Sequence, residues 1–342
     1  MKKLTTKEDI FNLLSASTSS IVLGMAIETG LLEMLAEKTM TAEEVSQAMN
    51  IPGKRGHYWL QLLTELGVLE KDSHGYVPSP LACNVILGAK DFEKLRMRHN
   101  ATDERERLAG VRNFALYVSE PSVWKAQGLT EPKGYVEKMK DDPERAYSFT
   151  HLLYNVHQNL GSELAEYLNL TGIHSLLDIG GGSGVEAMAF ARKYPELNIT
   201  TVDIENVCVV GRKIVEENQL SNRITFYPAD FLTNELPQDF DFILHCDVGV
   251  YSVDQFRKLW ASLKPEGWMA VIFHFPLFEY SAPVQFLEWA FLDSLMDPDF
   301  GFPTVAQVRE QLTQAGFQPF PGEHTLSDGR ILIQARKGIS HE

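Results

Sequence analysis

From residue 175 onward, short apolar runs alternate with segments of helix length, and this alternation constrains the fold more than any other feature of the chain. It predicts an α/β domain in which helices cover both faces of a mainly parallel sheet. The domain boundary is expected near residue 160. The expected strands are 175–179, 199–202, 224–227, 242–245 and 269–275, and two more, 316–319 and 330–335, are expected to close one edge.

The first expected strand runs into a glycine loop, 180–184, and a helix is expected directly after it. Glycines let the backbone approach a ligand closely, and the amides of a helix N-terminus point at that ligand. Asp203 ends the next strand, about twenty residues further on, where a carboxylate accepts hydrogen bonds from both ribose hydroxyls of a nucleoside. The pattern therefore predicts a nucleoside cofactor.

Two kinds of nucleoside cofactor compete for this loop. The run 182–187 matches the G-x-G-x-x-A pattern of NAD(P) enzymes. Asp178, however, stands just before the loop, where its charge opposes a pyrophosphate and suits a cationic amino acid tail. Asp230 and Phe231 follow the third strand, where a carboxylate can accept from an adenine amino group and a ring can pack on the base. A turn over 263–267 is expected before the fifth strand.

Together these motifs resemble the S-adenosylmethionine-dependent small-molecule O-methyltransferases of the caffeate and acetylserotonin type. The resemblance covers nearly the whole chain and implies a Rossmann-like class I methyltransferase domain, 161–342. It also implies an N-terminal all-helical winged-helix dimerisation domain, 1–100, and a helical connector, 101–160, that contributes to the acceptor pocket. S-adenosyl-L-methionine is the implied cofactor, and a homodimer is the implied assembly.

The resemblance also assigns cofactor contacts to individual residues. Asp203 would hold the ribose, and Asp230 with Phe231 the adenine. His157 stands where the family has a small polar residue, and Cys246 where many members have a lysine that touches the adenosine. The remaining predicted cofactor contacts are Asp178 and the loop glycines Gly180, Gly182 and Gly184.

The expected catalytic base is missing from its family position. Members of the family use a histidine after the fourth strand as a general base, and Val250 stands there in this chain. The carboxylate that supports that histidine is replaced by His274. Valine cannot accept a proton, so the base has moved, is not needed, or has been lost together with methyl transfer.

Three alternatives follow from this departure. In the first, His274 or His245, which end adjacent strands, acts as the base. In the second, Tyr251 handles the proton, because the segment Tyr251-Ser252 resembles that of the bacteriochlorophyll C-20 methyltransferase, which methylates carbon on a tetrapyrrole ring. In the third, the protein is a cyclase that binds the cofactor without transferring its methyl group.

The acceptor is expected to be a small, flat aromatic or polyketide-like molecule, methylated by default at a hydroxyl oxygen. The reason is an apolar, aromatic surface of the kind that binds such molecules. The predicted lining residues are Phe149, Leu153, Tyr154, Trp289 and Met296.

Charge and cysteine content exclude other classes of protein. The formal net charge is −15, and residues 1–85 hold 7 Lys and Arg against 10 Asp and Glu, so the helix-turn-helix pattern of this region does not predict a nucleic-acid-binding regulator. Three widely spaced cysteines predict no disulfide framework, and no metal site is expected. Without a signal peptide or a stretch long enough to span a bilayer, the chain is predicted to be cytoplasmic.

Overall fold

The computed structural model divides the chain into two compact units, Met1–Arg105 and Glu106–Glu342. The boundary predicted between residues 100 and 101 lies outside the described residues. The residues that the structure describes are 3–51, 53–88, 122–276, 282–283, 286, 290, 293–294, 297 and 299–338.

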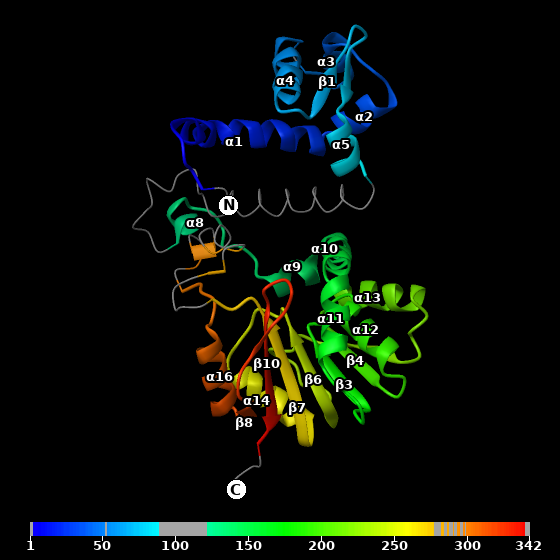
Figure 1. Ribbon diagram of the computed structural model, residues 1–342, viewed down its shortest axis with the longest axis vertical. Helices are drawn as coiled ribbons and strands as arrows, with labels where there is room; N and C mark the ends of the chain where they lie inside the picture. Colours follow the sequence, from blue (N-terminus) through cyan, green and yellow to red (C-terminus); the bar gives the residue numbers. More distant parts are fainter. Residues whose placement is uncertain are drawn as a thin grey trace. The chain divides into compact units, whose positions relative to one another are not determined.

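The first unit is helical with one hairpin (Figure 1). Its third helix begins with a capping box, in which Glu44 N donates to Thr41 Oγ1 at 3.2 Å and Thr41 N donates to Glu44 Oε2 at 2.8 Å. The fourth helix is followed by Gly67, with φ +73. The elements are α1 (Lys7–Glu28), α2 (Leu31–Glu37), α3 (Ala42–Ala48), α4 (Gly53–Glu65), β1 (Leu69–Lys71), β2 (Tyr76–Pro78) and α5 (Pro80–Val85).

Buried aliphatic side chains of α2 and α4, among them Leu32, Leu60 and Leu63, form the core of this unit. Trp59 Nε1 donates to the Val22 carbonyl at 3.0 Å and so ties α4 to α1. In the described part of the chain, no single helix has the length and apolar content needed to cross a membrane; the bent pair Ala16–Glu28 and Leu31–Glu37 passes that test by length and composition only.

The second unit is built on an eight-stranded sheet of order β5-β4-β3-β6-β7-β10-β8, with β9 paired to β10. The strands from β3 to β7 are parallel, and β10 runs antiparallel to β7, β8 and β9. The strands are β3 (Ser175–Ile179), β4 (Asn198–Asp203), β5 (Ile224–Pro228), β6 (Phe240–Cys246), β7 (Leu263–Phe273), β8 (Phe317–Pro319), β9 (His324–Thr325) and β10 (Ile331–Lys337).

The predicted α/β fold and all seven predicted strands are confirmed, and β9 is additional. The predicted turn over 263–267 is wrong, because this segment forms the first part of β7. Leu263 pairs with Phe240 of β6, and pairing resumes at Trp268 opposite Phe242, so the residues between form a bulge in which Glu266 has φ +68. After β5 the chain returns to the other side of β3, so the sheet reverses its strand order between β3 and β6, where such sheets bind ligands.

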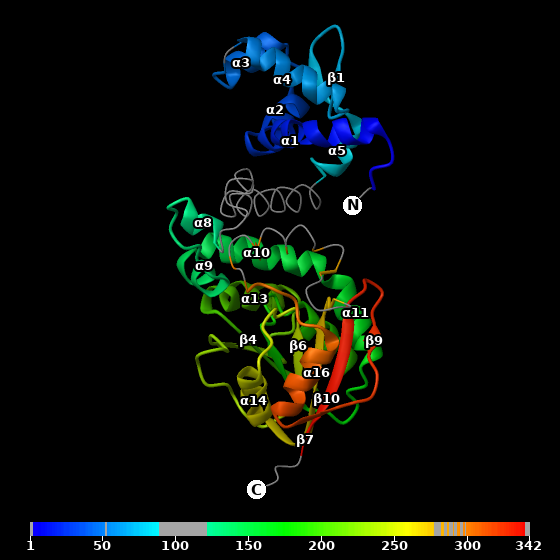
Figure 2. The same ribbon diagram turned by 90° about the vertical axis from the view of Figure 1, so that its left-hand side faces the viewer.

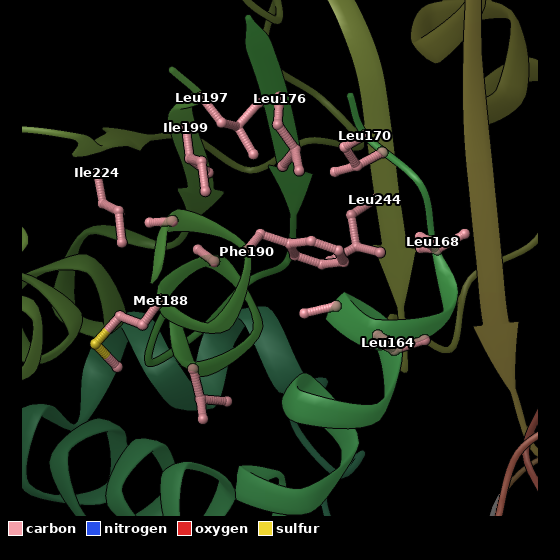
Figure 3. Close-up of a cluster of buried hydrophobic side chains, with 14 of the residues drawn as sticks. Leu164, Leu168, Leu170, Leu176, Met188, Phe190, Leu197, Ile199, Ile224 and Leu244 are labelled. Carbon is pink, nitrogen blue, oxygen red and sulfur yellow. The ribbon is translucent and has the colours of Figure 1, made fainter. Parts of the chain in front are cut away.

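Helices cover both faces of the sheet and enclose two apolar clusters. Figure 3 shows one cluster, in which Phe190 of α12 lies among leucine and isoleucine side chains of the sheet. The second cluster lies under α14 and α16 and includes Phe256 and Leu312. The helices of this unit are α8 (Val123–Ala126), α9 (Tyr135–Asp141), α10 (Pro143–Val156), α11 (Gln158–Tyr167), α12 (Val185–Lys193), α13 (Glu205–Glu217), α14 (Val253–Ser262) and α16 (Val305–Gln314).

The sequence predicts one long helix over 149–167, and the structure corrects this. The helix is broken at His157, which ends α10 and precedes α11. In Figures 1 and 2, α9 and α10 lie toward the end of the sheet opposite the C-terminal end of β10. The Asn206 side chain of α13 donates to the Met139 carbonyl at 2.8 Å, which joins α9 to the edge where the parallel strands end.

Candidate active site

The glycine loop between β3 and α12 adopts a backbone that glycine favours. Gly180, Gly182 and Gly184 have φ values of +64, +53 and +72. The fourth glycine, Gly181, has no room for a side chain, because a Cβ there would lie 2.0 Å from Asp178 Oδ2. A Cβ on Gly182 would meet only the Gly180 carbonyl, at 3.9 Å, so one side of the loop is open to a ligand.

Asp203 lies at the end of β4 and faces this loop. Its Oδ2 accepts from Gly182 N at 3.0 Å and its Oδ1 from Ile204 N at 2.7 Å. Burial raises the pKa of Asp203 to about 6, although these hydrogen bonds favour the carboxylate. Each oxygen keeps a second lone pair, so the carboxylate can still accept hydrogen bonds from ribose hydroxyls.

Asp178 lies beneath the loop, with 1% of its surface exposed. Its Oδ2 is 3.5 Å from Thr201 Oγ1, and burial together with the nearby Glu186 and Asp203 raises its pKa well above the usual range. The Asp178 side chain thus packs directly against the glycine loop at Gly181.

Asp230 and Phe231 follow β5, as expected from the sequence. Asp230 is nine-tenths buried, and its Oδ1 accepts from Leu232 N at 3.1 Å. Lys140 Nζ of α9 approaches Asp230 Oδ2 to 3.9 Å. The Phe231 ring lies beside the glycine loop, 3.9 Å from where a Cβ of Gly180 would stand.

His157, at the helix break, is buried between two carboxylates. Its Nδ1 is 2.9 Å from Glu186 Oε1, and its Nε2 is 3.3 Å from Asp247 Oδ2. Burial opposes the charged form, but the hydrogen bonds to Asp247 and Glu186 raise the pKa of His157 to about 9. The ring is therefore a cation at neutral pH and donates from both nitrogens.

Arg330, immediately before β10, completes this charged network. Its Nε lies 3.1 Å from Asp247 Oδ1 and its Nη2 2.5 Å from Asp247 Oδ2, a two-point pairing. Its Nη1 pairs with Asp328. Burial alone would raise the pKa of Asp247, but the hydrogen bonds from His157 and Arg330 lower it to about 2. We call these five residues, His157, Glu186, Asp247, Asp328 and Arg330, the buried ion network.

Sequence reasoning missed four members of this network. His157 was expected near the cofactor, but Glu186, Asp247, Asp328 and Arg330 were not singled out. Asp247 and Arg330 are 83 residues apart in the chain, and Arg330 and His157 are 173 apart. No spacing rule connects positions so distant. The available signal was the accumulation of charged residues at the predicted ends of strands.

His274 lies just past the end of β7, on the side of the sheet that holds the network. It is 6% exposed and makes an edge contact with the Phe286 ring at 5.1 Å between centroids. Burial and the Arg330 cation lower the pKa of His274, while Asp247, Asp328 and a hydrogen bond to the Gly329 backbone partly offset them. This histidine is therefore neutral at pH 7 and can accept a proton.

His245 and Tyr251 lie together on the other face of the sheet, under α14. Their ring centroids are 5.3 Å apart. His245 is fully buried, its Nε2 is 3.3 Å from Gln255 Nε2, and burial lowers its pKa to about 4. Burial raises the pKa of Tyr251, whose hydroxyl is buried. The Tyr251 ring contacts the rings of Phe273 and Phe275, which flank His274 in the chain, at 5.6 Å each.

Cys246 ends β6 on the same side as the buried ion network, and burial raises the pKa of its thiol. The thiol is therefore uncharged at neutral pH.

The predicted acceptor residues are not all gathered in one place. Phe149 packs with Met139 and Ile204 in a small cluster beside α13. Leu153 is half-buried on the same helix. The Tyr154 hydroxyl accepts from Asn218 Nδ2 of the α13 C-cap at 3.4 Å, which directs this side chain to α13. Trp289 and Met296 lie outside the described residues.

A group of aromatic rings contacts His274 through Phe286, and contacts Tyr251 through Phe273 and Phe275. Phe302 stacks at 5.9 Å on Phe273 and at 6.1 Å on Phe286. Phe275 makes an edge contact with Phe273 at 5.7 Å. We call Phe273, Phe275, Phe286 and Phe302 the aromatic cluster. A cluster of this kind suits a flat, apolar molecule.

The parallel sheet with its antiparallel edge, the glycine loop after β3 and the carboxylate at the end of β4 define a Rossmann-like nucleoside-binding domain of the methyltransferase class. Residues 120–263 match the O-methyltransferase domain family. The chain therefore carries an O-methyltransferase domain and is a methyltransferase, so the resemblance predicted from the cofactor motifs is confirmed. Members of this family depend on S-adenosylmethionine, and the predicted cofactor is confirmed with it.

Relatives of known name match most of the chain. The chain is 26% identical over 313 residues to the N,N-dimethyltransferase OxyT of Streptomyces rimosus, covering 90% of each chain. It is 26% identical over 342 residues to the tetracenomycin polyketide synthesis 8-O-methyl transferase TcmO of Streptomyces glaucescens, covering 94% of this chain and 96% of that one. The solved structure of PigF with SAH superposes with a TM-score of 0.79 at 18% identity, covering 97% of this chain and 100% of that chain, a likeness of fold.

Proposed function

We propose that the protein transfers a methyl group from S-adenosylmethionine to a hydroxyl oxygen of a small aromatic or polyketide-like acceptor, with His274 as the general base. The observation that carries this proposal is the position of His274, buried and neutral between the buried ion network and the aromatic cluster. Among the relatives, TcmO is named as an 8-O-methyl transferase of polyketide synthesis, which agrees with an oxygen acceptor.

The residues around the cofactor have separate tasks in this proposal. When bound, S-adenosylmethionine supplies a methyl group activated by its sulfonium charge. Asp203 accepts from the ribose hydroxyls, and Asp230 with Phe231 receives the adenine. The open side of the loop at Gly182 receives the amino acid portion. Holding donor and acceptor in line supplies much of the acceleration.

His274 accepts the acceptor's hydroxyl proton as the oxygen attacks. Because burial and the Arg330 cation lower its pKa, the ring is neutral at pH 7, and a neutral imidazole can take up a proton. The aromatic cluster holds the acceptor's ring and excludes water from the attacking oxygen. Tyr251 and His245 lie on the opposite face of the sheet. In this proposal they pack between the sheet and α14 and take no part in proton transfer.

Isotope transfer tests both parts of the proposal. With methyl-labelled S-adenosylmethionine and a panel of phenolic and polyketide acceptors, we expect label on oxygen. His274→Ala is expected to lower turnover by about 10²–10⁴-fold, with S-adenosylhomocysteine binding unchanged by calorimetry. The difference in turnover between His274→Ala and the wild-type protein should become smaller as the pH approaches the pKa of the phenol, because a phenolate needs no base.

The matched control is His174→Gln. His174 is exposed and directly precedes β3, at the end of the strand away from the glycine loop, so this substitution should leave turnover unchanged. Unaltered turnover in His274→Ala would remove the base from the proposal. Label recovered on nitrogen would instead favour a second candidate, amine methylation, which the name of the relative OxyT supports. Label on carbon would likewise contradict the oxygen acceptor.

We also propose that the first unit is a winged-helix dimerisation domain. The hairpin β1–β2 directly follows α4, as a wing follows its helix. Apolar side chains of α1 are exposed within this unit, among them Ile10 at 50%, Leu13 at 58% and Leu14 at 73%. Exposed apolar surface of this kind marks an interaction site, and a second copy of the chain is the proposed occupant.

A further inference from the structure

The loop that carries Asp230 and Phe231 is folded around two side chains. Asp230 N donates to Asn234 Oδ1 at 2.8 Å, and Asn234 N donates back to the Asp230 carbonyl at 2.8 Å. Asp230 Oδ1 also accepts from Leu232 N. These bonds use the amides of Asp230, Leu232 and Asn234. The carbonyls of Phe231, Leu232 and Asn234 take no part in them.

A single lysine of α14 satisfies all three carbonyls. Lys258 Nζ donates to Phe231 O at 2.9 Å, to Leu232 O at 2.9 Å and to Asn234 O at 2.7 Å. An ammonium group has three N–H donors, so each of its donors is used on this one loop. Hydrogen bonds from a charged donor are shorter and stronger than those from a neutral donor, so Lys258 holds this loop more firmly than a neutral side chain would.

The lysine stands on a rigid support. The N-terminus of α14 is capped by Ser252, whose Oγ accepts from Gln255 N at 3.1 Å. The neighbours Phe256 and Leu259 are fully buried in the core under the helix. The buried side chains hold α14 in place, and the three hydrogen bonds from Lys258 hold the loop at a fixed position relative to α14.

The clamped loop determines where two predicted adenine contacts lie. A carboxylate at Asp230 accepts from the exocyclic amine of adenine, and the Phe231 ring packs on the base. Hypoxanthine has a carbonyl oxygen in place of that amine, and this oxygen would face the carboxylate as a second acceptor. A site that depends on one well-placed polar group discriminates strongly against a ligand that lacks the matching group.

We propose that Lys258 is a positioning residue for the cofactor: its ammonium fixes the 230–234 loop so that Asp230 and Phe231 select adenine over other bases. This inference rests on the proposed function, in which these two residues receive the adenine. Lys258 touches neither cofactor nor acceptor in this proposal and acts only through the loop.

Calorimetry with two ligands tests the inference. The ratio of the dissociation constants of S-inosylhomocysteine and S-adenosylhomocysteine reports base selection without turnover. We expect the wild-type protein to prefer the adenosyl ligand by about tenfold or more. Lys258→Met is expected to reduce this preference to less than about threefold, mainly by weakening the adenosyl ligand. Lys258→Gln, which keeps a shorter neutral donor, should fall between them and replaces Lys258→Met if that variant does not fold.

Two matched variants separate positioning from general stability. Arg257→Met removes the adjacent cation of α14, which is exposed and pairs with Asp254, and should leave the ratio unchanged. Arg223 makes a comparable clamp on the carbonyls of Ala191, Tyr194 and Leu197, just before β5 begins. Arg223→Met should lower the melting temperature but not the ratio.

The possible failures differ from one another. A wild-type preference that persists in both Lys258→Met and Lys258→Gln overturns the positioning role and leaves the proposed function intact. A wild-type protein that binds both ligands equally overturns the assignment of Asp230 to adenine and the inference with it. A wild-type protein that binds neither ligand contradicts the proposed function itself.

Discussion

Asp203 accepts hydrogen bonds from two backbone amides and is still protonated more easily than a free aspartate. The amides of Gly182 and Ile204 favour the carboxylate, but burial outweighs them and brings the pKa to about 6. In the free protein, this carboxyl therefore titrates close to physiological pH. Ribose hydroxyls donate to the carboxylate, so a bound nucleoside lowers that pKa.

The sign of the pH effect follows from this difference between free and bound protein. Above pH 6 the carboxylate is already formed, and affinity for S-adenosylhomocysteine should be at its highest. As the pH falls below about 6, binding must first remove a proton, and affinity should drop by up to about tenfold per pH unit. Calorimetry from pH 5 to pH 8 measures this dependence.

The control for this prediction is Asp203→Asn, which cannot titrate. It should bind more weakly than the wild-type protein at pH 7–8, because its amide nitrogen must face one of the two backbone donors, Gly182 N or Ile204 N. Its affinity should show no step near pH 6. An affinity of the wild-type protein that is constant between pH 5 and pH 8 would contradict the role of Asp203.

At the scale of the elements, the buried ion network joins segments that the sheet alone does not hold together. His157 belongs to the break between α10 and α11, Glu186 to the first turn of α12, and Asp247 to the end of β6. Arg330 brings in the start of β10. The break in the predicted long helix is thus explained by the network, since it allows the His157 ring to lie between two carboxylates.

Removing one partner of a buried ion pair leaves the other charge uncompensated. We expect Arg330→Met to lower the free energy of unfolding by about 3–5 kcal/mol, because Asp247 loses its two-point partner. The unfolding transition of the second unit in urea measures this loss. It should be accompanied by reduced turnover, since Arg330 also helps to keep His274 neutral.

The matched variant is Arg336→Met, near the other end of the same strand. Arg336 pairs with Glu266, but these side chains are 44% and 76% exposed. Exposed pairs contribute about 0–1 kcal/mol, so this variant should be nearly as stable as the wild-type protein. Equal losses in the two variants would show that the buried ion network has no special role in stability.

At the scale of the whole molecule, the proposed dimer depends on the exposed apolar side chains of α1. Leu14→Asp places a charge in that surface and should weaken self-association by at least about tenfold. Sedimentation velocity over a range of protein concentrations measures the effect. Leu81→Asp, at a side chain of α5 that is 65% exposed, is the matched control and should leave the dimer intact. A wild-type protein that sediments as a monomer at all concentrations contradicts the proposal.

The sequence alone predicted the α/β fold, the strands of the sheet, the glycine loop and the position of Asp203 at the end of β4. These features depend on neighbours in the chain: alternation of apolar runs, backbone angles that favour glycine, and the rule that parallel strands end at one edge. The tertiary structure decided which face each strand-end side chain occupies. It placed His245 in the core, His274 beside Arg330, and Lys258 under the loop of Asp230. Contacts across 83 or 173 residues arise only when the chain is folded, because their geometry depends on packing and not on spacing along the sequence.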